Sequence, residues 1–287
     1  MAFNWQTFRT RSLTAAVFVI VMLTGLLWNR WSFFLLFSLV HFGAWVEYQK
    51  LVGQFNPDYQ KIVPAHRYGI MIGGWCLLLF FTNDELWLFG VRLSQIGFWA
   101  GILLMVALPV IMLIESRHLF LKNIVYSFCG LVYISLSLGL LINLRNHWND
   151  AQLPLSMTIP LLIIFSLWIN DTMAYIVGSI IGKTPLSKVS PKKTWEGTVG
   201  GIILTIVVIS LIAYLTHRLS ITDAAIMSGI AAISGTIGDL FESKLKRMAG
   251  VKDSGSIMPG HGGFLDRFDS LLFAAPCVYV YAAIVLS

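Results

Sequence analysis

The chain has 287 residues, of which 57% are hydrophobic and only 12% are charged, and its mean hydropathy is +0.77. Soluble domains carry about 25% charged residues, so this composition excludes an ordinary soluble globular protein and indicates an integral membrane protein. The formal net charge is +6. In a membrane protein such an excess is typical of cytoplasmic loops rich in Lys and Arg, and we expect no nucleic-acid partner.

A membrane-spanning helix needs about 20 mostly apolar residues. Nine such stretches lie at 12–28, 31–49, 67–82, 95–114, 123–144, 157–181, 197–216, 222–242 and 268–286. The third stretch, 67–82, is the weakest candidate for a membrane span. Sustained alternation of apolar and polar residues, which would indicate strands, is absent from the sequence. We therefore predict an all-α, polytopic integral membrane protein with about nine transmembrane helices.

The motif-like segments of the chain lie in its C-terminal half, not in the N-terminal stretches. The first stretch resembles a signal peptide but has no small-x-small cleavage site, so we expect a retained helix. We expect residues 1–155 to form an N-terminal transmembrane region whose helices pack together and shape a lipid pocket. Glu47 lies close enough to the end of its stretch to reach water, and we assign it no function on this evidence.

The sixth and eighth stretches contain acidic residues, which are costly in a membrane and usually functional. Asp171 lies within the sixth stretch. Asp239 and Glu242 lie three residues apart near the end of the eighth, so on a helix they share one face. Gly235 and Gly238 precede them, and small residues let another helix or a ligand approach closely. Structural hydrogen bonds, ion pairs or contact with water are the alternatives to a functional role.

The segment PGHGGFLDRFDS, residues 259–270, concentrates charge and glycine just before the last apolar stretch. Acids are favoured at a helix N-terminus, so either Asp266 or Asp269 alone could be a helix cap. Capping does not explain the neighbouring His261, Gly262, Gly263 and Arg267. Adjacent glycines allow backbone N–H groups to approach an anion such as phosphate.

Two pairs of acids, Asp239 with Glu242 and Asp266 with Asp269, could together hold a hard cation, since Mg²⁺ takes oxygen ligands from carboxylates and substrate phosphates. Many basic residues surround them: Lys183, Lys188, Lys192, Lys193, Lys246, Arg247, Lys252 and Arg267. Contact with anionic lipid headgroups is the alternative explanation for these bases. Acids, glycines and bases together favour phosphoryl-type chemistry, in which a metal and cations neutralise developing charge.

The basic residues also predict an orientation. With the N-terminus in the cytoplasm, all Lys and Arg residues fall on the cytoplasmic side except four, which are Arg30, Arg92, Arg145 and Arg218. This asymmetry follows the positive-inside rule. It places two motif-rich loops, about 182–196 and 243–267, in the cytoplasm. We expect residues 156–287 to form the catalytic transmembrane region that carries these loops.

The segment SKLKRMAGVKDSGSIMPGHGGFLDRFD, residues 243–269, closely resembles the signature of the phosphatidate cytidylyltransferase, or CDP-diacylglycerol synthase, family. The matching positions are Ser243, Lys246, Arg247, Lys252, Asp253, Pro259, His261, Gly262, Gly263, Asp266, Arg267 and Asp269. Met258 is a conservative departure, since the family usually has Leu, Ile or Phe there. Residues 170–197 also look like this family, and the resemblance covers about 160–287.

The resemblance implies a membrane enzyme of phospholipid biosynthesis that converts CTP and phosphatidate to CDP-diacylglycerol and pyrophosphate. It implies Mg²⁺, with which a monovalent cation such as K⁺ has been associated, and a multi-pass location in the cell inner (plasma) membrane. The family's metal-binding aspartates correspond to Asp239 and Asp266, and we expect Asp269 and Glu242 to assist them. Predicted catalytic residues are Asp239, Asp266, Lys246, Arg247, His261 and Arg267. Predicted substrate-binding residues are Asp171, Lys192, Lys193, Lys252, Gly262 and Gly263.

Two alternatives stay open. The same chemistry could act on a different lipid phosphate, since nothing in the N-terminal stretches specifies the lipid. An ion-coupled secondary transporter is the other, because acids in broken helices suit ion coupling. Against a transporter, the polar motifs all lie in the C-terminal half instead of recurring in both halves. The expected partners are CTP, phosphatidate and the lipid bilayer; the sequence is compatible with a homodimer but does not specify one.

Overall fold

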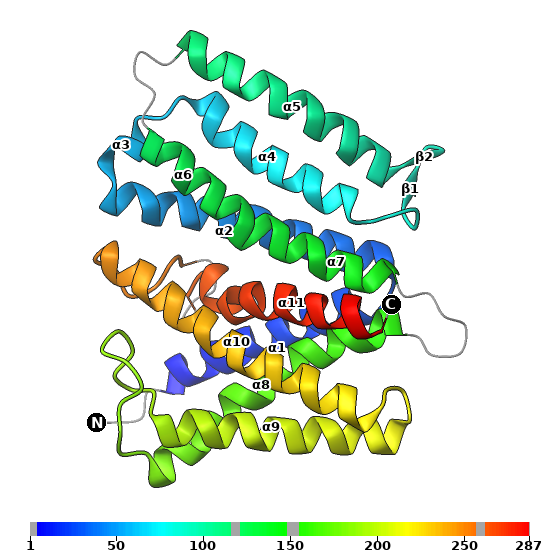
Figure 1. Cartoon of the computed structure of the whole chain (residues 1–287). Coiled ribbons are helices and arrows are strands. Elements are labelled where there is room, and N and C mark those ends of the chain that lie inside the picture. Colours follow the sequence, from blue (N-terminus) through cyan, green and yellow to red (C-terminus); the bar gives the residue numbers. More distant parts are fainter. Residues whose placement is uncertain (1–4, 116–120, 148–154, 257–261, 287) are drawn as a thin grey trace. The chain divides into compact units, whose positions relative to one another are not determined.

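The computed structural model describes residues 5–115, 121–147, 155–256 and 262–286, and it is almost entirely helical (Figure 1). The helices are α1 (Trp5–Leu27), α2 (Arg30–Phe55), α3 (Pro57–Gln60), α4 (Pro64–Phe80), α5 (Leu93–Glu115), α6 (Leu121–Gly130), α7 (Ser137–His147), α8 (Leu155–Ile181), α9 (Trp195–Thr216), α10 (Ile221–Met248) and α11 (Leu265–Val285). A π-helical segment, Leu131–Leu136, joins α6 to α7. A short hairpin of β1 (Trp87–Leu88) and β2 (Val91–Arg92) precedes α5.

The prediction of an all-α, multi-pass membrane protein is confirmed. A helix occurs at each of the nine predicted stretches. Six spans in the described residues are long and apolar enough to cross a membrane: Leu93–Ile114, Leu121–Asn146, Leu155–Ile181, Trp195–Thr216, Ile221–Met248 and Leu265–Val285. The helices of the first three stretches are shorter or more polar. For example, α4 has 17 residues, and α2 includes Arg30, Glu47 and Lys50.

The chain forms two compact units. Unit 1 comprises Met1–Ser135 and Met248–Phe268, and unit 2 comprises Leu136–Arg247 and Asp269–Ser287. The signature segment is therefore divided, because α11 begins in unit 1 and continues in unit 2. The functional division at residue 155, between a lipid-pocket region and a catalytic region, stays a prediction.

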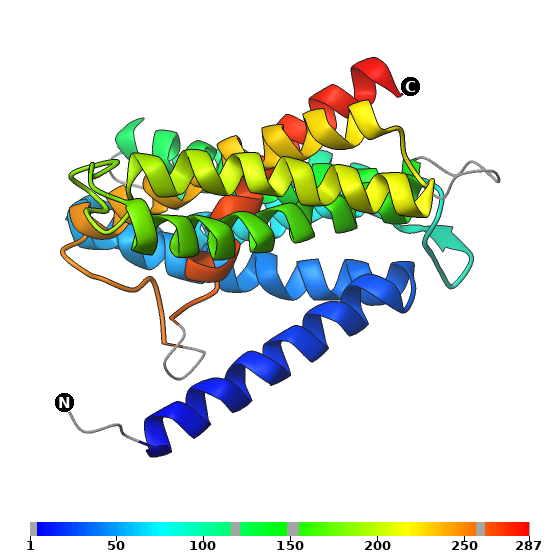
Figure 2. The same ribbon diagram turned by 90° about the horizontal axis from the view of Figure 1, so that it is seen from below.

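Unit 1 is organised around α2. Asn29 caps this helix, since its side chain accepts a hydrogen bond from the backbone of Ser32 at 2.8 Å. Figure 2 shows α1 and α2 diverging from the turn at this cap. The side chains of Phe33, Phe37 and Trp45 are fully buried in the core. Helices α4 and α5 lie side by side, joined by the hairpin (Figure 1).

Unit 2 contains the packed pair α8 and α9, which lie side by side (Figure 2). The connecting loop is folded back on itself, since Leu186 N–H donates to Lys193 O at 2.7 Å and Trp195 N–H donates to Thr184 O at 2.9 Å. The Glu196 carboxylate on α9 closes the loop by accepting the N–H of Thr184 at 3.2 Å. The loop that presents Lys192 and Lys193 is therefore tied to both helices.

Candidate active site

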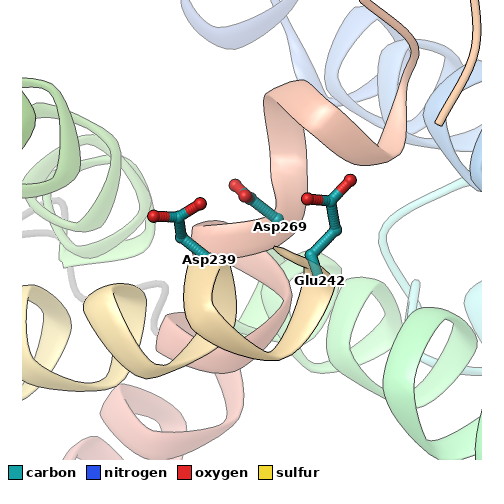
Figure 3. A group of neighbouring side chains, drawn as sticks. All are labelled: Asp239, Glu242 and Asp269. Atoms are coloured by element: carbon teal, nitrogen blue, oxygen red, sulfur yellow. The ribbon is translucent and has the colours of Figure 1, made fainter. Parts of the chain in front are cut away.

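Three acidic side chains of unit 2 converge where α10 meets α11. Asp239 and Glu242 extend from α10 and Asp269 from α11, and their side chains point to the same side of the two helices (Figure 3). One carboxylate oxygen of each lies within 4.8 Å of the others. Glu242 and Asp269 are buried, whereas the Asp239 side chain is partly exposed. Within the described ranges this is the one group of three or more potential ligands close enough to hold a metal ion.

Gly238 explains why the two helices approach so closely. A Cβ atom at this position would lie 2.5 Å from the backbone oxygen of Asp269 and 3.1 Å from the Cβ of Phe273. Both distances are shorter than an ordinary contact, so only glycine fits without moving the helices apart. This is the close approach that the sequence indicated, and it brings Asp269 to the acids of α10.

Two lysines neutralise part of this acidic cluster. Lys193, from the loop between α8 and α9, forms an ion pair with Asp239. Lys246 lies one turn after Glu242 on α10 and forms an ion pair with it, and the Glu242 side chain has no exposed surface. A charge buried to this extent is tolerated when it is paired. The negative charges of Asp239 and Asp171 repel the Asp269 carboxylate, whereas Lys193 attracts it.

Asp266 lies in unit 1, in the first turn of α11, and organises the preceding loop. Its Oδ2 atom accepts hydrogen bonds from the backbone N–H groups of Gly263 and of Ser254, both at 2.8 Å, and lies 2.9 Å from Ser254 Oγ. Gly262 adopts φ +82°, a left-handed conformation that favours glycine. Ser254 and Gly263, nine residues apart in the chain, therefore both bind this carboxylate.

Glu47 corrects the sequence-based interpretation. We expected this side chain to reach water, but it is only 5% exposed. It accepts hydrogen bonds from Ser254 Oγ at 2.7 Å and from the backbone N–H groups of Phe264 and Leu265 at 2.9 Å. The interpretation was wrong because a loop more than 200 residues later in the chain covers Glu47. No local pattern in the sequence signals such a contact.

Comparisons with known proteins show to which family the chain belongs. The model of the Cytidylyltransferase family matches residues 9–285, which is most of the chain. The chain belongs to this family. The match extends to the N-terminal helices, well beyond the C-terminal part that carries the signature resemblance.

Several curated relatives of this cytidylyltransferase-family chain are named phosphatidate cytidylyltransferase. The protein of Synechocystis sp. is 39% identical over 52% of the chain and 53% of its own length. That of Aquifex aeolicus is 44% identical over 42% and 45%, respectively. That of Rickettsia bellii is 35% identical over 61% of the chain and 77% of its own length. The chain thus spans about half the length of the first two relatives.

The family's expected metal pair, Asp239 and Asp266, joins residues of different units and stays a prediction. Asp269 and Glu242, which we expected to assist, lie with Asp239 in the cluster. Lys193 and Lys246 also reach it. The other predicted bases lie at exposed positions: Lys192, Arg247, Lys252 and Arg267. His261 lies outside the described residues.

The cluster suits a magnesium ion in its donor chemistry. Carboxylate oxygens are hard ligands, and Mg²⁺ is usually bound by one or two carboxylates together with water and substrate phosphates. At Mg–O distances of about 2.0–2.1 Å, ligand oxygens lie roughly 3–4 Å apart. The observed oxygen separations of up to 4.8 Å therefore need only small side-chain adjustments to accept the ion. Asp239, Glu242 and Asp269 are the residues that would hold it.

Proposed function

We propose that this chain transfers the cytidylyl group of CTP to a lipid phosphate, phosphatidate, and releases CDP-diacylglycerol and pyrophosphate. An oxygen of the lipid phosphate forms the new bond to the α-phosphorus of CTP, and the bond from that phosphorus to the pyrophosphate oxygen breaks. The observation that carries the proposal is the cluster of three carboxylates and two lysines at the meeting of two apolar helices. The names of the relatives support the choice of substrates.

The residues suit a reaction governed by positioning and charge. A phosphate monoester is already a nucleophile near neutral pH, so the reaction requires no strong base, and catalysis is mainly orientation and neutralisation. Bound Mg²⁺ would supply charge neutralisation at the phosphates. Lys193 and Lys246 place ammonium groups beside the carboxylates. When substrate binds, phosphate oxygens can replace the carboxylates as the partners of these ammonium groups.

Further roles follow from the sequence and belong to the same proposal. Asp266 would complete the metal site and K⁺ would accompany Mg²⁺. Phosphate and nucleotide contacts would come from Asp171, Lys192, Arg247, Lys252, His261, Gly262, Gly263 and Arg267. The exposure of the four basic residues in this set is compatible with such contacts.

We further propose nine membrane spans with the N-terminus and both motif loops in the cytoplasm of a cell whose inner membrane holds the protein. Helices at all nine stretches and the distribution of Lys and Arg support this topology. An apolar cavity of about 720 Å³ in unit 1, lined by residues of α4, α5 and α6 such as Leu77, Phe98 and Leu108, supports a lipid-binding role for the N-terminal region. A homodimer stays a prediction that a mass measurement in detergent tests.

The deciding experiment incubates purified protein in detergent with labelled CTP, Mg²⁺ and a panel of lipid phosphates that includes phosphatidate and an isoprenoid-ether lipid phosphate. We expect lipid-linked CMP with phosphatidate and a loss of at least about 100-fold in Asp239→Asn. Asp58→Asn is the control, because Asp58 is an exposed acid paired with Lys61. Product with the isoprenoid-ether lipid phosphate, and none with phosphatidate, would identify the isoprenoid lipid as the substrate. No lipid-linked CMP with any acceptor would refute the proposal, and ion-coupled flux in liposomes without CTP would favour a transporter.

A further inference from the structure

We propose that Glu47 is a positioning residue for the reaction, because its buried carboxylate binds Ser254 and the start of α11, where Asp266 lies. This inference rests on the proposed function. Glu47 lies on α2, outside the segment that carries the signature resemblance, and no role follows for it from that resemblance. The contacts that carry the inference all lie within unit 1.

The first part of the evidence is that Glu47 caps α11 from another helix. The first N–H groups of a helix have no partner within the helix. Here Oε1 of Glu47 accepts the N–H of Phe264 at 2.9 Å, and Oε2 accepts the N–H of Leu265 at 2.9 Å. The negative charge also lies at the positive end of the helix dipole. One side chain thus fixes where α11 begins.

The second part is the link from Glu47 to Asp266. Ser254 Oγ lies 2.7 Å from Glu47 Oε2 and 2.9 Å from Asp266 Oδ2. The Ser254 backbone N–H also donates to Asp266 Oδ2 at 2.8 Å. Ser254 has one hydroxyl proton, which it donates to Glu47 at the shorter distance, while its backbone N–H donates to Asp266. It is only 2% exposed, so water has little access to replace these two bonds. The position of Glu47 is therefore transmitted through Ser254 to the Asp266 carboxylate.

The third part is the fit of the loop around the carboxylate. A Cβ atom on Gly255 would lie 2.2 Å from Glu47 Oε1, and one on Gly263 would lie 2.3 Å from both carboxylate oxygens. The loop backbone therefore encloses Glu47 at two glycines. In the part of the chain that the structure describes, the ion pairs do not include Glu47. Its charge is stabilised by the N–H and O–H donors of the loop, which makes those donors dependent on Glu47.

The test compares wild type with Glu47→Gln, Glu47→Asp and the control Asp58→Asn. Glutamine keeps the shape but places an NH₂ group where an acceptor is needed. Two readouts are measured: kcat and KM for CTP per folded molecule, and amide hydrogen exchange at Phe264 and Leu265. For Glu47→Gln we expect kcat to fall at least about tenfold with a smaller change in KM. Exchange at both amides should accelerate by a similar factor, while exchange in unit 2 stays unchanged.

Glu47→Asp keeps the charge on a side chain shorter by one CH₂ group, so intermediate values are expected in both readouts. If Glu47→Gln does not fold, the same two readouts in Glu47→Asp decide the inference. Wild-type kcat together with unchanged exchange at the two amides in a folded variant would overturn the inference. A uniform rise in exchange along the whole chain would also overturn it, because Glu47 would then be needed only for stability. If wild type forms no product, the proposed function fails, and the exchange measurement still decides whether Glu47 holds the loop.

Discussion

Gly238→Ala tests whether the close contact of α10 and α11 sets the geometry of the acidic cluster. The added methyl group would lie 2.5 Å from the backbone oxygen of Asp269, and that oxygen cannot rotate away as a side-chain tip could. An ordinary contact of this kind needs about 3.4 Å or more, so α11 must move by roughly 1 Å relative to α10. The Asp269 carboxylate moves with its helix, away from Asp239 and Glu242.

The effect on activity should exceed the effect on stability. Overpacking costs about 1–3 kcal/mol of folding free energy, but the gain in helix propensity from glycine to alanine returns about 1 kcal/mol. A 1 Å misplacement of catalytic groups costs about 100-fold in rate. That factor corresponds to about 2.7 kcal/mol in the activation free energy. We therefore expect a folded, modestly destabilised protein with severely reduced kcat.

The assay measures labelled CTP incorporated into lipid per folded molecule, over a range of Mg²⁺ concentrations, together with thermal unfolding. Gly229→Ala is the matched control on the same helix, because its methyl group would lie 3.3 Å from Cδ1 of Ile206, the flexible end of a side chain. We expect that variant to keep activity within about twofold. Gly238→Ala with near-normal kcat and an unaltered Mg²⁺ requirement would show that the helix contact does not control the site.

Three other predictions concern the charges of unit 2. Lys246→Met removes the ion pair that Lys246 makes with the buried Glu242 carboxylate and should lower the free energy of unfolding by up to about 3–5 kcal/mol. Adding Glu242→Gln should restore most of the loss, and chemical denaturation of both variants measures this. Glu196→Ala removes the acceptor that closes the loop 182–194, so limited proteolysis of that loop should accelerate and KM for CTP should rise, with little change in thermal stability. In wild type, chelation of divalent cations should abolish product formation, and added Mg²⁺ should restore it. Lys193→Met should alter the Mg²⁺ concentration at half-maximal activity, because Lys193 pairs with Asp239. An unchanged concentration would argue against a site that Lys193 and Mg²⁺ share.

The long helices were predictable because an apolar stretch of sufficient length has few other ways to satisfy its backbone in a membrane. The stretch 95–114, for example, corresponds to α5, Leu93–Glu115. The shortest elements were not predictable. The hairpin has two residues in each strand, which is too few to produce an alternating pattern. Likewise, the four residues of α3 cannot show a helical period.

The candidate site was predictable where its geometry is local. The spacing of Asp239 and Glu242 placed them on one face of a helix, and Lys246 follows Glu242 by one further turn. Asp269 could be chosen only by its charge and its motif, because sequence spacing does not say which helices touch. The pairing of Lys193 with Asp239 could not be predicted for the same reason, since the sequence does not show which lysine of the loop reaches the acid.

Glu47 shows why polarity alone is a poor guide to role near a helix end. An acid there has two ways to avoid the membrane: it can reach water, or it can be surrounded by donors from elsewhere in the chain. The two outcomes have the same local sequence, and here the second holds, since Ser254, Phe264 and Leu265 supply the donors. A helix of the N-terminal region thus supplies the acceptor for two backbone N–H groups of the signature segment. Packing and lipid contact do not require a buried carboxylate on α2, whereas the N–H groups of Phe264 and Leu265 at the start of α11 do require an acceptor.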